Sequence, residues 1–157
     1  MKSLARIIHL GFRPAKSMIY SHWSKCEWDS KRWPNFTPKE FSSPDNGQLY
    51  WDPVFFDKMQ AMRTALGKPL KLNSAHRSYR HNIFVRGAVR SMHKKIAVDV
   101  SLRGHNRFHM LSAARAVGFT GFGYAQNFLH LDLGRKRFWY YGKHSKALWQ
   151  TETLEAA

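Results

Sequence analysis

Two polar side chains interrupt the leucines of FLHLDLG at residues 128–134. With strand periodicity, the three leucines fall on one face of a predicted strand, while His130 and Asp132 fall on the other. Leucines at this spacing are typical of a buried face. The histidine and the aspartate then require either solvent or a chemical role, and side chains of both types can bind a metal ion.

A second predicted strand, IAVDVSL at residues 96–102, has the same design. Its large aliphatic side chains share one face, and Asp99 lies on the opposite face. If the two strands are neighbours in a sheet, Asp99, His130 and Asp132 converge. His93, just before this strand, can join them. The two patterns therefore predict a sheet with one apolar face and one face that carries metal-binding groups.

Two histidines and one carboxylate suit zinc, because neutral imidazole and carboxylate bind it in tetrahedral geometry at about 2.0 to 2.2 Å. Three protein ligands leave a fourth position for water, which separates a catalytic zinc site from a structural one. Water at that position can be deprotonated near neutral pH and used as a nucleophile. A hydrolase is the function that this set of residue types favours.

Each residue also has an explanation without catalysis. His93 alone fits a solvated loop histidine, and Asp99 alone fits a carboxylate paired with one of the many arginines. The pair His130 and Asp132 is harder to explain in this way, because a polar pair opposite a leucine face indicates a wet groove. The remaining histidines fit no comparable geometry.

The elements around these residues predict an α+β fold, a small antiparallel sheet with helices packed on one face and the zinc site on the other. A capping box with proline predicts a short helix at residues 37–40. Asp52 can cap the next helix, whose apolar residues recur at helical spacing until Gly67 ends it. The remaining predicted elements are a strand at 69–74, a helix at 106–116 and a hairpin that joins FLHLDLG to RFWYYG through residues 134–136.

The charge of the chain points to a polyanionic partner. In 157 residues, 26 lysines and arginines face 10 acidic residues, which gives a net charge of +16. Scattered basic residues, without an RNA-binding aromatic pattern or zinc-finger spacing, make nucleic acid the less favoured partner. Bacterial wall polymers and anionic membrane surfaces remain open. Cys26 is the single cysteine, so an intramolecular disulfide and a cysteine-based zinc site are both excluded.

The composition suggests three segments. Residues 1–35 are a basic, aromatic-rich N-terminal extension, either a packed or partly disordered arm or a dedicated binding segment. Residues 36–145 carry the catalytic pattern, and residues 146–157 form a C-terminal tail. Because the start of the chain lacks a signal-peptide pattern and no run is long enough to span a membrane, we expect synthesis in the cytoplasm without a signal peptide.

From about residue 36 to residue 142, the chain resembles the M15 peptidases, which are zinc-dependent D-Ala-D-Ala carboxypeptidases and phage endolysin peptidases that cut peptidoglycan stem peptides. The similarity covers roughly two thirds of the chain. It runs in order through NFTPKEF, MRTALGKPL, NSAHRSYRHN, RGAVRSMH, IAVDVSL, ARAVGFTGFGY and FLHLDLG. The resemblance implies an M15/hedgehog-like α+β fold and one zinc ion per chain.

The resemblance also implies a role for each site residue. His93, Asp99 and His130 are then the zinc ligands, and Asp132 is the carboxylate that positions or deprotonates the zinc-bound water. Arg77 falls where the family keeps an arginine that holds the substrate and its developing negative charge. A permanently charged, forked guanidinium suits that task.

The ligand loop departs from the family pattern, Ser-x-His-x-x-Gly-x-Ala-x-Asp. Residues 91–99 are one residue shorter and lack the glycine, which predicts a tighter loop that could move His93 away from the metal. Ser91 is expected to support this loop by hydrogen bonding. His76 stands where a tyrosine is common, and Asn127 stands where some relatives have the catalytic acid. The base is for this reason assigned to Asp132.

The favoured function is a zinc peptidase acting on peptidoglycan, in which metal-activated water attacks the scissile carbonyl. Small size, strong positive charge and the missing signal favour a monomeric phage endolysin that acts at the bacterial cell wall or periplasm. An endopeptidase is slightly favoured over a carboxypeptidase. The alternative is a non-catalytic module that keeps the fold, has lost the metal and binds cell wall or another polyanion.

Overall fold

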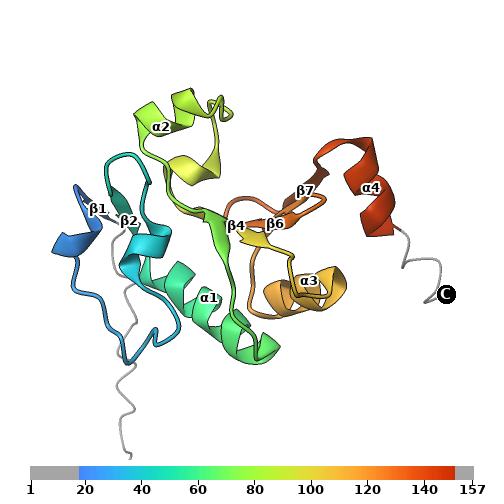
Figure 1. Cartoon of the computed structure of the whole chain (residues 1–157), viewed down its shortest axis with the longest axis horizontal. Helices are drawn as coiled ribbons and strands as arrows, with labels where there is room; N and C mark the ends of the chain where they lie inside the picture. Colours follow the sequence, from blue (N-terminus) through green and yellow to red (C-terminus); the bar gives the residue numbers. More distant parts are fainter. Residues whose placement is uncertain (1–17, 151–157) are drawn as a thin grey trace, which may run out of the picture.

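Five strands form the central sheet of the computed structural model, which describes residues 18–150 (Figure 1). All neighbouring pairs run antiparallel except β5 and β7, which are parallel. The strand order across the sheet is β3 (Leu72–Ser74), β4 (Ala97–Ser101), β6 (Phe128–Asp132), β5 (Gly121–Tyr124) and β7 (Arg137–Tyr140). β1 (Met18–Tyr20) and β2 (Leu49–Trp51) form a separate antiparallel pair.

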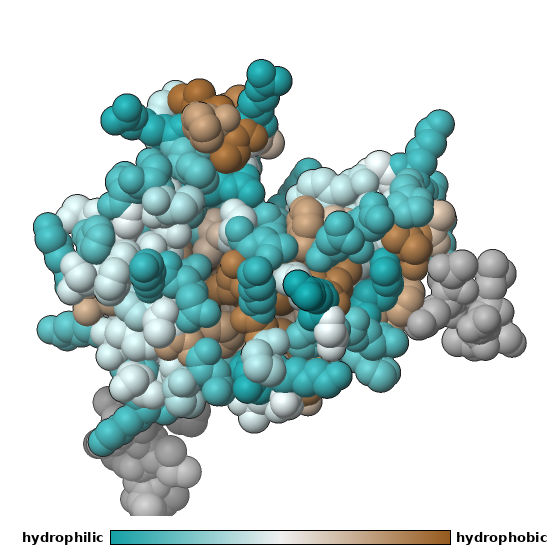
Figure 2. All heavy atoms as spheres, in the orientation of Figure 1, coloured by the Kyte–Doolittle hydropathy of each residue, from teal (hydrophilic) through white to brown (hydrophobic). Residues whose placement is uncertain are grey.

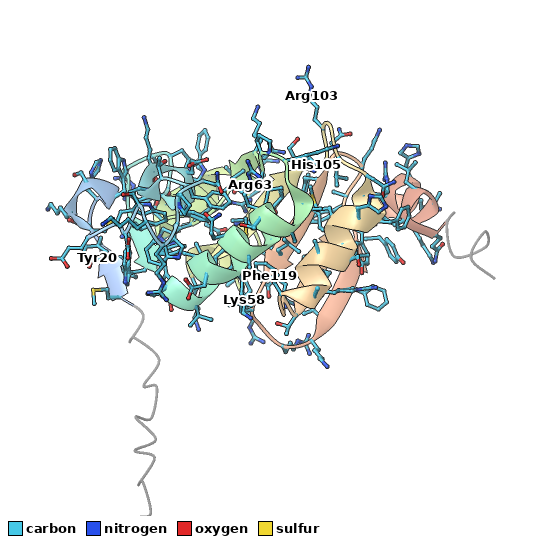
Figure 3. The ribbon with its side chains drawn as sticks, turned by 90° about the horizontal axis from the view of Figure 1, so that it is seen from below. Tyr20, Lys58, Arg63, Arg103, His105 and Phe119 are labelled. Carbon is cyan, nitrogen blue, oxygen red and sulfur yellow. The ribbon has the colours of Figure 1, made fainter. Side chains whose placement is uncertain are left out.

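Helices surround this sheet, and the predicted α+β class is confirmed. Helices α1 and α3 lie side by side over one face (Figure 3), where the Lys58 ammonium donates to the Val117 carbonyl at 2.7 Å. Helix α2 projects on the other side of the sheet (Figure 1).

The α-helices are α1 (Pro53–Leu66), α2 (Tyr79–Phe84), α3 (Arg107–Ala116) and α4 (Gly142–Gln150). The 3-10 helices are η1 (Trp23–Lys25), η2 (Pro38–Phe41) and η3 (Met92–Lys94). Within residues 18–150, no helix is both long and apolar enough to cross a membrane.

Local sequence signals place several of these elements. Asp52 caps α1 by accepting a hydrogen bond from the Phe55 N–H at 3.1 Å, and Gly67 ends it with φ of 63°. Asn106 caps α3 in the same way. The capping box at residues 37–40 forms the 3-10 helix η2. The predicted helices and both strands of the site therefore lie where the sequence puts them.

The predicted hairpin between β6 and β7 is wrong. β6 pairs with β4 on one edge and with β5 on the other, so it has no free edge for β7. The chain instead crosses to the far edge of β5, where β7 pairs in parallel. Thr120 Oγ1 donates to the Gly134 carbonyl at 2.6 Å and holds the connecting turn against the start of β5.

The core extends past both predicted segment boundaries. Trp33 is buried, and Trp28 packs on Phe41 and Phe56 with ring centroids 6.0 and 5.1 Å apart. Trp149 of α4 is also buried and donates from Nε1 to the Ala125 carbonyl at 2.7 Å. The divisions predicted at 35/36 and 145/146 thus do not coincide with breaks in packing. The part of the extension before residue 18 and the tail after residue 150 lie outside the described residues.

Candidate metal centre

Asp99 and His130 face each other across two adjacent strands of the sheet, β4 and β6. They are direct partners in the antiparallel register of β4 and β6. Their neighbours Val98, Val100 and Leu131 belong to the hydrophobic core. Because alternate residues of a strand point to opposite faces, the two polar side chains lie on the face away from the core.

His93 completes the cluster from η3. Its Nε2 lies 3.2 Å from Asp99 Oδ1 and 3.1 Å from His130 Nδ1, and Asp99 Oδ1 lies 2.9 Å from His130 Nδ1. All three residues are buried. Within residues 18–150, they are the group of histidine, cysteine and acidic side chains whose ligand atoms, all within 4.8 Å of one another, could hold a metal ion.

The remaining ring nitrogens decide which atoms are available to a metal. His93 Nδ1 donates to the Ala75 carbonyl at 2.6 Å, so its Nε2 presents a lone pair to the cluster. His130 Nε2 donates to Asp132 Oδ2 at 2.9 Å, so its Nδ1 does the same. With Asp99 Oδ1, three electron-pair donors therefore meet. Ligand atoms of a tetrahedral zinc ion are about 3.3 Å apart, which matches these separations.

The short ligand loop keeps His93 in place because it is bonded to the segment after β3. The Arg77 N–H donates to the His93 carbonyl at 2.6 Å. His76 is buried and donates from Nδ1 to the Lys95 carbonyl at 2.6 Å. Ser91 Oγ accepts from the His93 N–H at 3.2 Å, so Ser91 lies where a support of the loop was expected. The shortened loop therefore still delivers His93 to the cluster.

Asp132 does not lie where its predicted role as base requires. It contacts the His130 nitrogen that faces away from the cluster, and it is fully buried. Arg137 donates to both of its oxygens, at 2.9 and 2.6 Å, and the Gly134 N–H donates at 2.8 Å. The assignment to a base is corrected on this geometry: the carboxylate is separated from the cluster by the imidazole ring, and it orients His130 instead.

Charges around the cluster keep both carboxylates ionised. Burial alone would raise the pKa of Asp99, but the close His130 and His93 rings, which can carry positive charge when no metal is bound, outweigh it and hold this pKa well below its ordinary value. Burial also opposes ionisation of Asp132, yet His130 and Arg137 hold its pKa low as well. For His130, burial would lower the pKa, but the bonds to Asp132 and Asp99 raise it.

A cleft of about 450 Å³ opens over the cluster. Figure 2 shows the surface hollowed between helix α2 and the side that carries β7 and α4. Arg77 lines this cleft, donating from Nη2 to Asp99 Oδ2 at 3.3 Å and from Nε to Ser74 Oγ at 3.0 Å. Asp99 is the single carboxylate among the lining residues. The other charged or aromatic lining residues are Arg86, Arg90, His93, Phe128, His130, Arg137, Trp139 and Tyr141.

A sequence model of the peptidase M15 family matches residues 35–132, more than half of the chain. The chain belongs to the peptidase M15 family. No curated protein matches the sequence. The family match includes Arg77, Ser91 and the three clustered ligand candidates, and it ends at Asp132. The chain is therefore a peptidase by family, and its buried cluster could hold a metal ion.

This M15 peptidase has cleft residues that sequence reasoning missed. Trp139 packs on His130 with ring centroids 5.0 Å apart, and Tyr141 packs on Phe128 at 5.1 Å. Gly123 of β5 permits this arrangement, because a Cβ at that position would collide with the rings of Trp139 and Tyr141. The run of aromatic residues in RFWYYG is typical of a strand, but only the position of β7 beside β5 brings these rings over the cluster.

Proposed function

We propose that this M15 peptidase is a zinc-dependent enzyme that hydrolyses peptide bonds in peptidoglycan stem peptides, as a phage endolysin does. The observation that carries the proposal is the meeting of three electron-pair donors, from His93, Asp99 and His130, on the floor of a cationic cleft. Zn²⁺ bound by these side chains would polarise the scissile carbonyl and lower the pKa of water in the cleft.

The residues behind the ligands hold their geometry. Asp132 fixes the His130 ring through Nε2, and Arg137 in turn fixes Asp132 with two hydrogen bonds. The Ala75 carbonyl plays the same part for His93. Such partners hold each imidazole in the tautomer and orientation that a metal requires. We therefore assign Asp132 to positioning rather than to proton abstraction.

The cleft charge favours an acidic substrate. Arg77, Arg86, Arg90 and Arg137 line it, against the single carboxylate of Asp99. Stem peptides carry free carboxylates, and guanidinium groups bind such oxygens as forks of hydrogen bonds. Because Arg77 already contacts the Asp99 carboxylate, its guanidinium lies beside the cluster, where it can hold a substrate carbonyl or carboxylate.

Tyr141 is the proton donor that we propose beside the cluster. Burial, and then the nearby Asp99 charge, raise the pKa of its phenol above the ordinary value, so the O–H is retained at neutral pH. A retained O–H can donate a hydrogen bond to the negative charge that develops on the carbonyl oxygen. No second carboxylate lines the cleft among residues 18–150 to compete for this role.

The proposed setting is the bacterial cell wall, where the enzyme acts as a monomer. The net charge of +16 would hold it on anionic wall polymers, and that attraction should weaken as salt shortens the Debye length to about 10 Å at 0.1 M. Sedimentation of the purified chain measures the oligomeric state. Binding to isolated walls at rising salt measures the electrostatic part of the association.

The test combines metal analysis with digestion of purified walls. The wild type should carry about one zinc ion per chain, clear wall preparations and lose activity with a chelator. His130→Ala should lose both metal and activity, while His144→Ala, an exposed histidine of α4, should keep both. Activity that survives chelation and His130→Ala contradicts the zinc mechanism.

Two further readouts separate the alternatives. A chain that binds walls but takes up no zinc after supplementation is the non-catalytic binding module. Mass spectrometry of the released muropeptides names the bond that is cut, because an endopeptidase and a carboxypeptidase release different fragments. A terminal residue as the sole product would replace the endopeptidase with a carboxypeptidase.

A further inference from the structure

Helix α2 and the turn after it, residues 79–90, form a projection whose large apolar side chains face solvent. Phe84 and Val89 are each 83% exposed. Three arginines, Arg80, Arg86 and Arg90, are interspersed with them and are also exposed. Figure 2 shows the apolar surface gathered over α2 and flanked by hydrophilic groups. The exposed apolar residues of this α2 projection are Tyr79, Ile83, Phe84, Val85 and Val89.

The α2 projection is braced from inside, so its apolar side chains are held outward. Asn82 is buried, and its Nδ2 donates to the Ala88 carbonyl at 3.2 Å. The Gly87 N–H donates to the Asn82 carbonyl at 2.8 Å, and the Ser91 N–H donates to the Ala88 carbonyl at 2.9 Å. An exposed apolar patch rimmed by polar groups is typical of a site that contacts a protein, a membrane or a ligand.

We propose that the α2 projection docks on the surface of a bilayer that contains anionic phospholipid. Apolar side chains at the tip can enter the boundary between headgroups and acyl chains, and the arginines among them can bind lipid phosphates. A hydrophilic wall polymer would engage the arginines but would leave Phe84 and Val89 in water. The combination of apolar tip and positive rim therefore favours a lipid surface over a polysaccharide.

Docking in this way would set the position of the cleft relative to the bilayer. Arg86 and Arg90 belong to the α2 projection and also line the cleft over the candidate metal centre. A bilayer that binds the projection would thus lie beside the mouth of the cleft. The lipid contact does not rest on the proposed metal chemistry, since Phe84, Val89 and Arg80 do not line the cleft.

The test is co-sedimentation of the full chain with vesicles of phosphatidylcholine, with and without phosphatidylglycerol. The wild type should bind the anionic vesicles, and Phe84→Ser/Val89→Ser should bind at least about tenfold more weakly because both apolar contacts are lost. Phe138→Ser is the matched control, since Phe138 is an exposed aromatic residue of β7 outside the α2 projection and should bind as the wild type does.

Arginine variants test the charged part of the contact. Arg80→Gln should weaken binding about fivefold, the effect of about 1 kcal/mol per arginine near an anionic surface. Arg103→Gln, whose side chain extends into solvent from the turn after β4 (Figure 3), should bind as the wild type does. Thermal unfolding of every variant establishes that the fold is retained.

Three outcomes would overturn the proposal. One is an absence of binding to anionic vesicles. This outcome would also follow if the α2 projection binds an acidic protein or a wall fragment and not a bilayer. Another is equal binding by the wild type and by Phe84→Ser/Val89→Ser, which would assign the contact to other basic segments. The third is an equal loss in the Phe138→Ser control.

Discussion

The central sheet and the α2 projection border the same cleft, but they distribute polar and apolar side chains in opposite ways. In the sheet, the polar side chains of Asp99, His130 and Asp132 are buried, and each is bonded to at least two groups. In the α2 projection, a polar residue, Asn82, is buried as a brace, while apolar residues face solvent. The comparison suggests that the sheet fixes the geometry of the site and that the projection determines what surface the site approaches.

Among the substitutions in the central sheet, Asp99→Asn should have the largest effect on zinc affinity. It removes the one anionic ligand candidate and leaves an amide between His93 and His130. Zinc affinity should fall by more than about 100-fold, beyond the range typical of residues behind the ligands. Competition with a chromophoric chelator measures it, with Asp57→Asn, a partly exposed carboxylate of α1 paired with Arg32, as the control. Unchanged affinity would remove Asp99 from the ligand set.

Asp132→Asn should cost about 10- to 100-fold in zinc affinity or activity, because the amide orients His130 less well than a carboxylate. KM for a small peptide substrate should change little, since Asp132 is sealed away from the cleft. Steady-state kinetics separate kcat from KM. A pH–rate profile that loses its acidic limb in this variant would restore Asp132 as the base.

His76→Phe should lower the stability of the ligand loop, because the Lys95 carbonyl loses the donor that buried His76 supplies, while the volume is roughly kept. We expect a loss of about 1 to 3 kcal/mol in the free energy of unfolding. Urea denaturation measures it. His105→Phe is the matched control, since His105 bonds the Pro69 carbonyl at 2.9 Å in a more exposed position and should cost less.

Asp45 joins the body of the protein to the start of α2, and it should make that junction sensitive to acid. Burial would raise the pKa of Asp45, but hydrogen bonds from Ser43 and Ser78 outweigh it and lower the pKa. A carboxylate with a lowered pKa stabilises the fold above its unfolded pKa of about 3.9, and the effect is lost as pH falls through the folded value. The stability difference between wild type and Asp45→Asn should therefore be present at pH 6 and shrink below about pH 4. Urea titrations at both pH values check it, and a constant difference would contradict it.

Phe84→Ser should have the smallest effect on stability, within about 0.5 kcal/mol, because its side chain is already in water. Leu129→Ala, at a fully buried position on β6, should cost about 2 to 5 kcal/mol. Activity on a small soluble peptide should be unchanged by Phe84→Ser. Comparable destabilisation by the two substitutions would show that the α2 projection is part of the core.

Sequence patterns predicted the parts of the site that depend on local periodicity. Alternation alone put Asp99 and His130 on the polar faces of two strands, and the register of β4 and β6 places them opposite each other. The prediction of a β6–β7 hairpin was wrong because the partner of β7 depends on which strand edges are free. That is a property of the whole sheet. For the same reason, Trp139 and Tyr141 could not be assigned to the cleft.

The position of Asp132 could not be read from strand periodicity either. Because Asp132 shares a strand face with His130, periodicity predicted that its carboxylate lies near the proposed metal. The contact that decides the role of Asp132 is the ion pair with Arg137. That pair depends on the turn after β6 and on the closeness of β7. The role of His76 could not be predicted from the sequence either, because it depends on a hydrogen bond to one backbone carbonyl of a loop that is distant in sequence.

With metal binding as proposed, the direct pairing of Asp99 with His130 would make ion uptake a reporter of correct strand alignment. A slip of one residue between β4 and β6 would turn one of the two side chains toward the helices and scatter the donor atoms. Chains trapped in that alternative during refolding could not gather three ligands around a cation. The colour of Co²⁺ added to a refolding mixture would then appear only as the native alignment is reached.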